Sequence, residues 1–130
     1  NKALKIVLIN KINNLVIKMD LIRSEKKGII LFKVNLVRAT LKEAEVFKNM
    51  LKKDIDSGNK KLVIDLSFCE FIDSTFLGTI VISLKKITAI GGDIKLVGFQ
   101  PAVRSMFELT RISKVFETFE STDEAVNSFQ

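Results

Sequence analysis

The chain has no histidine, one cysteine (Cys69) and one proline in 130 residues. Without histidine, neither a Ser-His-Asp nor a Cys-His catalytic centre can form, and His-ligated zinc is excluded. A single cysteine excludes an intramolecular disulfide, so Cys69 is interpreted as a small buried residue in a reducing, cytoplasmic setting. These absences favour a protein that is not an enzyme and that holds no metal and no other cofactor.

Proline-rich and low-complexity tracts are also missing, whereas 47% of the residues are apolar. A disordered or linker-rich chain does not have this composition. A chain of this length can bury roughly two-thirds of the surface that it exposes when unfolded. No internal repeat and no second domain boundary interrupts the sequence, so a single domain is expected.

Long apolar runs are absent from the first 19 residues, "NKALKIVLINKINNLVIKM". The short runs are interrupted by lysine and asparagine, which is unlike a membrane-spanning helix or a signal peptide. Two alternatives remain for residues 1–19. They form an extra N-terminal hairpin, with "LKIVLI" and "NLVIKM" flanking the turn-prone "NKINN", or they are a cloning remnant ahead of a native start at Met19. The domain itself is expected to cover residues 20–130.

The formal charge of +6 is not spread evenly along the chain. Residues 1–19 contain no acidic residue and four lysines: Lys2, Lys5, Lys11 and Lys18. The remainder is therefore close to neutral, and it has no arginine cluster and no aromatic pattern suited to stacking on RNA bases. We expect neither a nucleic acid nor a membrane as a partner.

Strand and helix patterns alternate after residue 19. Residues 20–25 and 28–34 are rich in branched apolar residues and flank the turn signal "KKG", which predicts a hairpin. Residues 40–55 have helical periodicity, with Ala44, Phe47, Leu51 and Ile55 on one face. Thr40 and Glu43 form a T-x-x-E capping box at the start of this segment.

The second half repeats the alternation. Strands are predicted at residues 61–66, 93–98 and 115–119, and helices at 75–90, 101–109 and 122–129, the last with a capping box of Ser121 and Glu124. In the helix 75–90, the predicted core stripe is Leu77, Val81, Leu84 and Thr88, with Phe76, Ile80 and Ile87 beside it. The pattern predicts an α/β fold with a mixed central β-sheet and about four helices.

The stretch "FIDSTFLG", residues 71–78, places a carboxylate and two hydroxyls between apolar runs. Ser74 is either the N-cap of the next helix, a nucleophile, or a hydroxyl that is modified. A nucleophile needs a base, and only Asp73 is near in sequence, so catalysis is disfavoured. A phosphate on Ser74 would be tolerated, because the first turn of a helix presents free amides and partial positive charge.

Residues 20–127 resemble a STAS domain, the fold shared by bacterial anti-sigma-factor antagonists and the cytoplasmic tails of sulfate transporters. Antagonists of this family have a strand ending in an apolar-Asp-apolar run, a D-S-[ST]-G-L-G helix start, a glycine before the next strand and a late F-E-L-T-G-L segment. In the same order and spacing, this chain has Val63–Leu66, Asp73–Gly78, Gly91-Gly92 and Phe107–Ile112.

The resemblance implies that Ser74 is the phosphoacceptor of a partner kinase, with Thr75 as a secondary acceptor. It implies a surface for an anti-sigma factor with serine kinase activity, and a phosphatase as a further partner. The expected contact residues are Asp73, Ser74, Thr75, Phe76 and Thr40. In this scheme the unphosphorylated chain sequesters the anti-sigma factor and so releases a sigma factor.

Two positions depart from the family pattern. Phe76 replaces a glycine and Thr40 replaces an aspartate at the start of the first predicted helix. Thr40 can still cap that helix, whereas Phe76 either fills the core or leans out as an anchor for a partner. The alternative function is a STAS scaffold that docks without switching, in a signalling assembly or as a domain of a transporter or lipid-transport system.

Overall fold

The hairpin predicted for residues 20–34 forms one edge of the main sheet. The computed structural model describes residues 1–130, in which β1 (Leu21–Lys26) and β2 (Ile29–Val34) pair antiparallel. Lys27 and Gly28 form the turn between them, with φ of 55° and 77°. Glycine adopts this left-handed backbone without steric cost, which explains the "KKG" signal.

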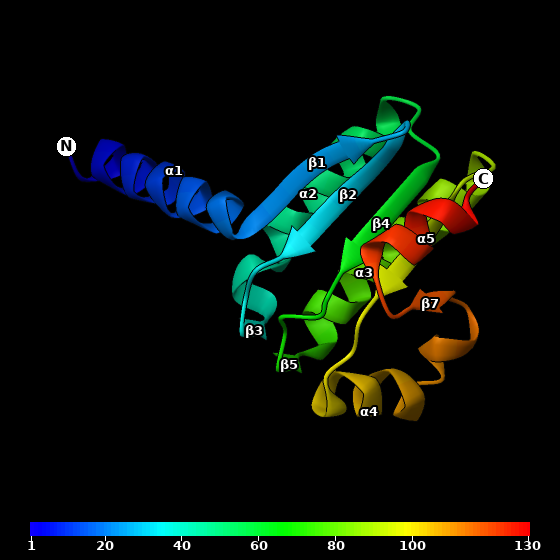
Figure 1. Cartoon of the computed structure of the whole chain (residues 1–130). Coiled ribbons are helices and arrows are strands. Elements are labelled where there is room, and N and C mark those ends of the chain that lie inside the picture. The colour runs from blue at the N-terminus through cyan, green and yellow to red at the C-terminus, as the bar shows by residue number, and fades with distance from the viewer.

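Three further strands extend the sheet, all parallel to β2 and to one another. β4 (Lys61–Asp65), β6 (Asp93–Val97) and β7 (Thr118–Phe119) give the order β1-β2-β4-β6-β7. The sheet is therefore mixed, as predicted, although only two residues of the expected strand 115–119 pair with β6. Figure 1 shows β1, β2 and β4 running side by side.

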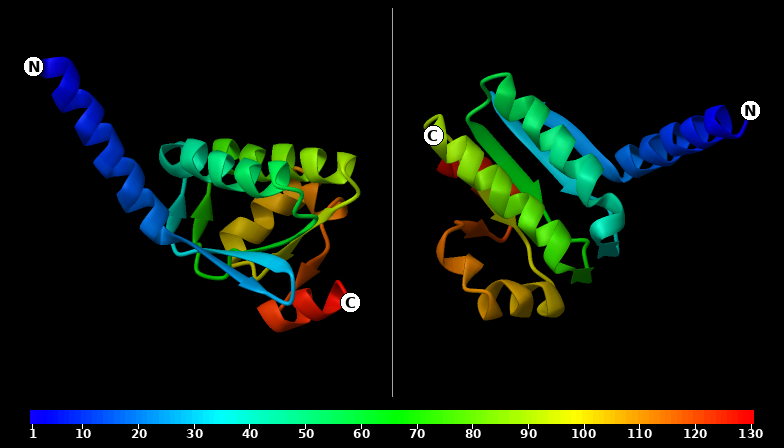
Figure 2. Two further views of the ribbon diagram at one scale, coloured as in Figure 1. Left: turned by 90° about the horizontal axis from the view of Figure 1, so that it is seen from above. Right: turned by 180° about the vertical axis from the view of Figure 1, so that it is seen from behind.

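Helices α2 (Leu41–Asp56) and α3 (Ser74–Ala89) lie side by side on one face of the sheet (Figure 2). The predicted capping box of Thr40 and Glu43 forms at the start of α2. The predicted core face of α2 is confirmed, since all four of its side chains are buried: Ala44, Phe47, Leu51 and Ile55. Helical periodicity located this face because α2 presents one continuous stripe to the core.

The core face of α3 differs from the prediction. Of the predicted stripe, only Leu77 is buried, and the side chains expected beside it form the face instead: Phe76, Ile80 and Ile87. Thr79 and Ser83 are buried too, and the Thr79 hydroxyl lies 3.5 Å from the carbonyl oxygen of Ala44. Because α3 packs against α2 as well as the sheet, its buried face is turned by about one residue position, roughly 100°.

On the other face of the sheet, α5 (Thr122–Ser128) packs over β4, β6 and β7 and buries Ala125 and Val126. Ser121 caps α5 by accepting a bond from the Glu124 amide at 3.2 Å, but no reciprocal Glu124 bond forms, so the second capping box is only half present. Helix α4 (Pro101–Leu109) and the 3-10 helix Ile112–Lys114 complete the fold.

The prediction of a hairpin in residues 1–19 is wrong. These residues belong to α1 (Lys2–Asp20), which projects from the domain and has no buried residue (Figures 1 and 2). Asn1 caps the helix by accepting from the Leu4 amide at 2.8 Å. The segment "NKINN" contains no glycine to reverse the chain, so helical hydrogen bonding continues through it. With α1, the fold has five α-helices.

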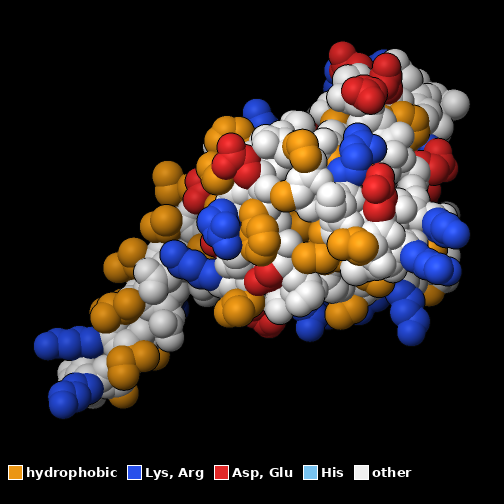
Figure 3. Space-filling model, turned by 90° about the horizontal axis from the view of Figure 1, so that it is seen from below, with side chains coloured by type: hydrophobic (Ala, Val, Ile, Leu, Met, Phe, Trp, Pro, Cys, Tyr) orange, Lys and Arg blue, Asp and Glu red, His pale blue; other side chains and the backbone are white.

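Apolar side chains on α1 remain exposed on several sides. Figure 3 shows them on the projecting helix, interspersed with lysines. None of the helices combines the length and the apolar content that a bilayer crossing requires.

Candidate functional site

Two short strands bring the starts of α2 and α3 together. β3 (Arg38–Ala39) precedes α2, β5 (Phe71–Ile72) precedes α3, and the two pair in parallel as a separate two-stranded sheet. Because the strands run in the same direction, each delivers its helix start to the same edge of the molecule. The "FIDSTFLG" stretch therefore lies beside the Thr40 capping box.

Asp73 joins the two helix starts through its carboxylate. Oδ1 accepts a bond from the Phe76 amide in the first turn of α3, and Oδ2 accepts one from the Leu41 amide in the first turn of α2, both at 2.8 Å. The Asp73 amide also donates to the carbonyl oxygen of Ala39 at 3.0 Å. One carboxylate thus accepts hydrogen bonds from first-turn amides of two helices, which have no partner within their own helix.

Ser74 is not the N-cap, which corrects that interpretation of the sequence. Asp73 is the cap, Ser74 is the first residue of α3, and the Ser74 side chain is exposed. Its hydroxyl makes no hydrogen bond within the chain, and Thr75 beside it is exposed as well. No bond joins Asp73 to Ser74, as a nucleophile and base would require. The hydroxyl of Ser74 is therefore free for a partner or a modifying enzyme.

Thr40 occupies the neighbouring helix start and is half-buried. Its Oγ1 accepts from the Lys42 amide at 3.3 Å and donates to Glu43 Oε2 at 3.1 Å, and its own amide donates to the same Glu43 oxygen at 2.9 Å. Thr40 thus performs the capping role of the aspartate that it replaces.

Phe76 lies in the core, which is one of the two roles expected for it, and its buried side chain is not available to a partner in this structure. It is 0% exposed and stacks on Phe47 with ring centroids 5.1 Å apart and planes at 6°. Phe47 in turn meets Phe32 edge-on at 5.6 Å. The ring replacing the family's glycine is drawn inward because this packing removes a large apolar surface from water.

Leu41 is the residue that sequence reasoning missed at this edge. It is the first residue of α2, its amide is bound by Asp73, and it is 68% exposed. Its spacing provides no signal, because Leu41 lies three positions before Ala44 and so continues the i, i+3 pattern of the core stripe. At the first position of α2, directly after the cap, it is exposed instead.

Cys69 is buried, and its thiol donates to the carbonyl oxygen of Val34 at 3.7 Å. Burial raises its pKa to about 12, because the thiolate would lose its hydration. The prediction of a small buried residue rather than a reactive thiol agrees with this environment.

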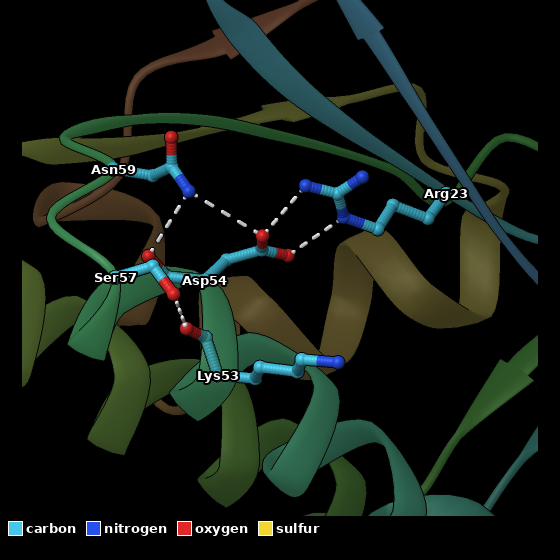
Figure 4. Close-up of polar contacts among 5 residues, drawn as sticks. All are labelled: Arg23, Lys53, Asp54, Ser57 and Asn59. Carbon is cyan, nitrogen blue, oxygen red and sulfur yellow. Dashed lines mark hydrogen bonds and ion pairs between the residues drawn. The ribbon is translucent and has the colours of Figure 1, made fainter.

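A second polar cluster lies away from this edge, where β1 meets the end of α2 (Figure 4). Arg23 donates two bonds to the Asp54 carboxylate, at 2.7 and 3.0 Å, and Asn59 donates to the Asp54 carbonyl oxygen at 3.1 Å. The cluster lines a cavity of about 480 Å³. Arg23 and Asp54 form an ion pair with two hydrogen bonds. We therefore interpret the cluster as a structural contact that holds the hairpin against α2.

Comparison with known proteins gives one family. The family described as "STAS domain" matches residues 25–125. A protein of Thermotoga neapolitana is 31% identical over 97 residues, covering 75% of this chain and 82% of the relative. One of Bordetella bronchiseptica is 28% identical over 97 residues, covering 75% and 79%. Both carry the name "putative anti-sigma factor antagonist".

Solved structures agree in fold. The crystal structure of a Thermotoga maritima protein with the same name has a TM-score of 0.76 at 25% identity, covering 83% of this chain and 92% of that one. The phosphorylated form of the Bacillus cell fate determinant SpoIIAA has a TM-score of 0.69 at 13% identity, covering 85% and 99%. At 13% identity the likeness to SpoIIAA is one of fold alone.

Proposed function

Because this chain belongs to the STAS domain family, we propose that it is an anti-sigma-factor antagonist switched by phosphorylation of Ser74. In this proposal the unphosphorylated chain binds an anti-sigma factor that has serine kinase activity, and a sigma factor is released. Phosphorylation ends the binding, a phosphatase restores it, and Thr75 is a secondary acceptor. The chain itself acts by binding and not as an enzyme, in the cytoplasm.

The observation that carries the proposal is the free, exposed hydroxyl of Ser74 at the first position of α3. Asp73 performs the capping that Ser74 would otherwise perform, so modification of Ser74 breaks no hydrogen bond of the fold. A phosphate at this position faces the partial positive charge of the helix start, which tolerates anions. The fold can therefore accept the modification without rearrangement.

The switch follows from charge. A phosphate adds about −1.5 to −2 charges to an otherwise neutral pair of hydroxyls. If the partner surface fits the hydroxyl and offers no cation, binding would bury the phosphate dianion without an opposite charge. The loss of hydration of that dianion makes such binding strongly unfavourable. Asp73 makes the mismatch larger, because its carboxylate already lies at the same helix start.

Binding by charge-mimicking variants tests the proposal. Each purified serine kinase of the anti-sigma-factor class from the same genome is titrated with the wild type, Ser74→Ala and Ser74→Asp. We expect Ser74→Ala to bind like the wild type and Ser74→Asp to bind at least tenfold more weakly. Equal affinities of the two variants would contradict the switch and favour a docking scaffold, in a signalling assembly, a transporter or a lipid-transport system.

A further inference from the structure

We propose that α1 binds the surface of a lipid bilayer that contains anionic lipids. In this role the helix lies at the boundary between headgroups and acyl chains and does not cross the bilayer. This departs from the expectation of no membrane partner, because residues 1–19 belong to a projecting helix and not to the hairpin considered from the sequence. The role of α1 is independent of the switch at Ser74.

Exposed apolar side chains are concentrated on α1. Of the seventeen large apolar side chains that are exposed in the whole chain, nine lie on this helix, and they range from 48% exposed at Val7 to 75% at Met19. The other eight are scattered over residues 21–130. Scattered apolar residues are normal on a protein surface, whereas a contiguous group marks an interaction surface. Because α1 has no buried residue, the domain itself does not cover this group.

The charge of α1 favours an anionic partner surface. The helix contains four lysines, and its only acidic residue is Asp20, the last residue before β1. Figure 3 shows lysines interspersed with apolar side chains along the helix. The aliphatic stem of a lysine lets its ammonium group reach lipid headgroups while neighbouring apolar side chains lie among the acyl chains. An anionic bilayer surface therefore suits both kinds of side chain on the same helix.

The domain surface beside α1 does not neutralise these lysines. Two cavities, of about 480 and 590 Å³, lie between α1 and the domain, and the charged domain residues that line them are Arg23, Lys42, Glu43, Lys53 and Asp54. Asp54 is paired with Arg23. Glu43 is bonded to the cap residue of its own helix. No ion pair joins α1 to the domain, so the positive charge of α1 is available to a partner.

A second copy of the chain, or a protein groove, covers α1 less well. Pairing α1 with α1 would set two groups of lysines side by side, with one acidic residue per helix to offset them. A protein groove covers one side of a helix, whereas α1 exposes apolar side chains on several sides. A helix embedded in the interfacial region of a bilayer meets lipid beneath it and along both flanks. Lipid therefore covers more of the exposed apolar surface.

Vesicle sedimentation with the full chain tests this role. One set of vesicles is phosphatidylcholine alone, and the other contains about 30% phosphatidylserine. We expect binding to the anionic vesicles to be at least tenfold stronger than to the neutral ones, and to weaken as salt is raised from about 0.1 to about 0.5 M because screening increases. Absence of binding to the anionic vesicles, or equal binding to both sets, would overturn the inference.

Two leucines separate the contribution of α1 from that of the remaining surface. Leu8→Asn places a polar group within α1, and Leu109→Asn makes the same change at the end of α4, where Leu109 is 84% exposed. We expect Leu8→Asn to weaken binding to the anionic vesicles at least tenfold and Leu109→Asn to change it less than twofold. Thermal unfolding of both variants should match the wild type, because neither residue is in the core. Equal effects on binding would contradict α1 as the binding element.

Two pairs of lysines test the charge. Lys5→Gln and Lys11→Gln are combined on α1, and Lys85→Gln with Lys86→Gln, both exposed on α3, gives a control of equal net charge. We expect the α1 pair to weaken binding to the anionic vesicles at least tenfold and the α3 pair to weaken it less than threefold. Equal effects would mean that only net charge counts, and the assignment to α1 would be wrong.

Sedimentation equilibrium without lipid checks the second copy as occupant. We expect a monomer. A dimer that Leu8→Asn dissociates, in a chain that does not bind vesicles, would assign α1 to a second copy and overturn the inference. These measurements need no kinase, and Ser74→Asp should bind vesicles like the wild type, so failure of the switch and failure of this role are distinguishable.

Discussion

Helices α1 and α2 are of similar length, 19 and 16 residues, but α1 projects from the domain and α2 packs on the sheet. α1 is richer in apolar residues and buries none of them, whereas α2 buries a continuous stripe. The difference lies in spacing. Apolar side chains of α2 recur every three or four residues on one face, while those of α1 surround the helix. Periodicity, more than apolar content, decides which helix joins the core.

The N-termini of the two helices are also capped differently. Asn1 caps α1 by a bond to its own first turn only. The α2 start has a complete capping box of its own and, through the Leu41 amide, a link to Asp73 at the start of α3. A local cap suffices to begin a helix, but a shared carboxylate also fixes one helix against another.

The largest expected effect comes from removing a ring in the helical layer. Phe76→Ala should lower the free energy of unfolding by about 3 kcal/mol or more, because it leaves a cavity against Phe47 in the buried core. Leu8→Ala on α1 is the control, since Leu8 is exposed. Urea denaturation of the two variants measures the difference. Similar stability of both would show that α3 does not pack as described.

An intermediate effect is expected from the caps. Asp73→Ala removes the acceptor for two helix starts and should cost about 1–2 kcal/mol of stability. Asn1→Ala removes the cap of α1 and should leave the main unfolding transition unchanged, because α1 is outside the core. Thermal unfolding of the two variants makes the comparison, and an equal loss would mean that α1 supports the domain.

The smallest effect should follow from deleting residues 1–18. Only Ile17 of this segment packs, partly buried, against the main core. A chain beginning at Met19 is therefore expected to unfold cooperatively, with stability changed by about 0.5 kcal/mol or less. A truncated chain that stays soluble but shows no thermal transition would contradict the proposal that residues 20–130 fold alone.

Local sequence patterns identified most of the core elements but not how two helices meet. The hairpin and the stripe of α2 were predictable, because turn signals and periodicity act within a few residues. The face of α3 was misplaced because its contact with α2 depends on residues far away in the chain, including Phe47. Of the two alternatives for residues 1–19, the hairpin does not form, and the sequence suggested it because short branched apolar runs occur in both helices and strands.

Part of the candidate site was likewise predictable from local sequence, and part was not. The motif located Ser74 and Thr75 correctly at an exposed helix start. The sequence could not assign the capping bond to Asp73 over Ser74, since both residue types are good caps. It also could not reveal the bond from the Leu41 amide to Asp73, which spans 32 positions. That contact exists only because β3 and β5 pair in parallel.

The central claim is that Ser74 is the residue through which this chain is switched. Its most direct test is phosphosite mapping by mass spectrometry after incubation with ATP, magnesium and each anti-sigma-factor kinase of the same genome. The account predicts phosphate on Ser74, with Thr75 modified secondarily, and no nucleotide bound by this chain itself. Modification only at residues other than Ser74 and Thr75 would contradict it.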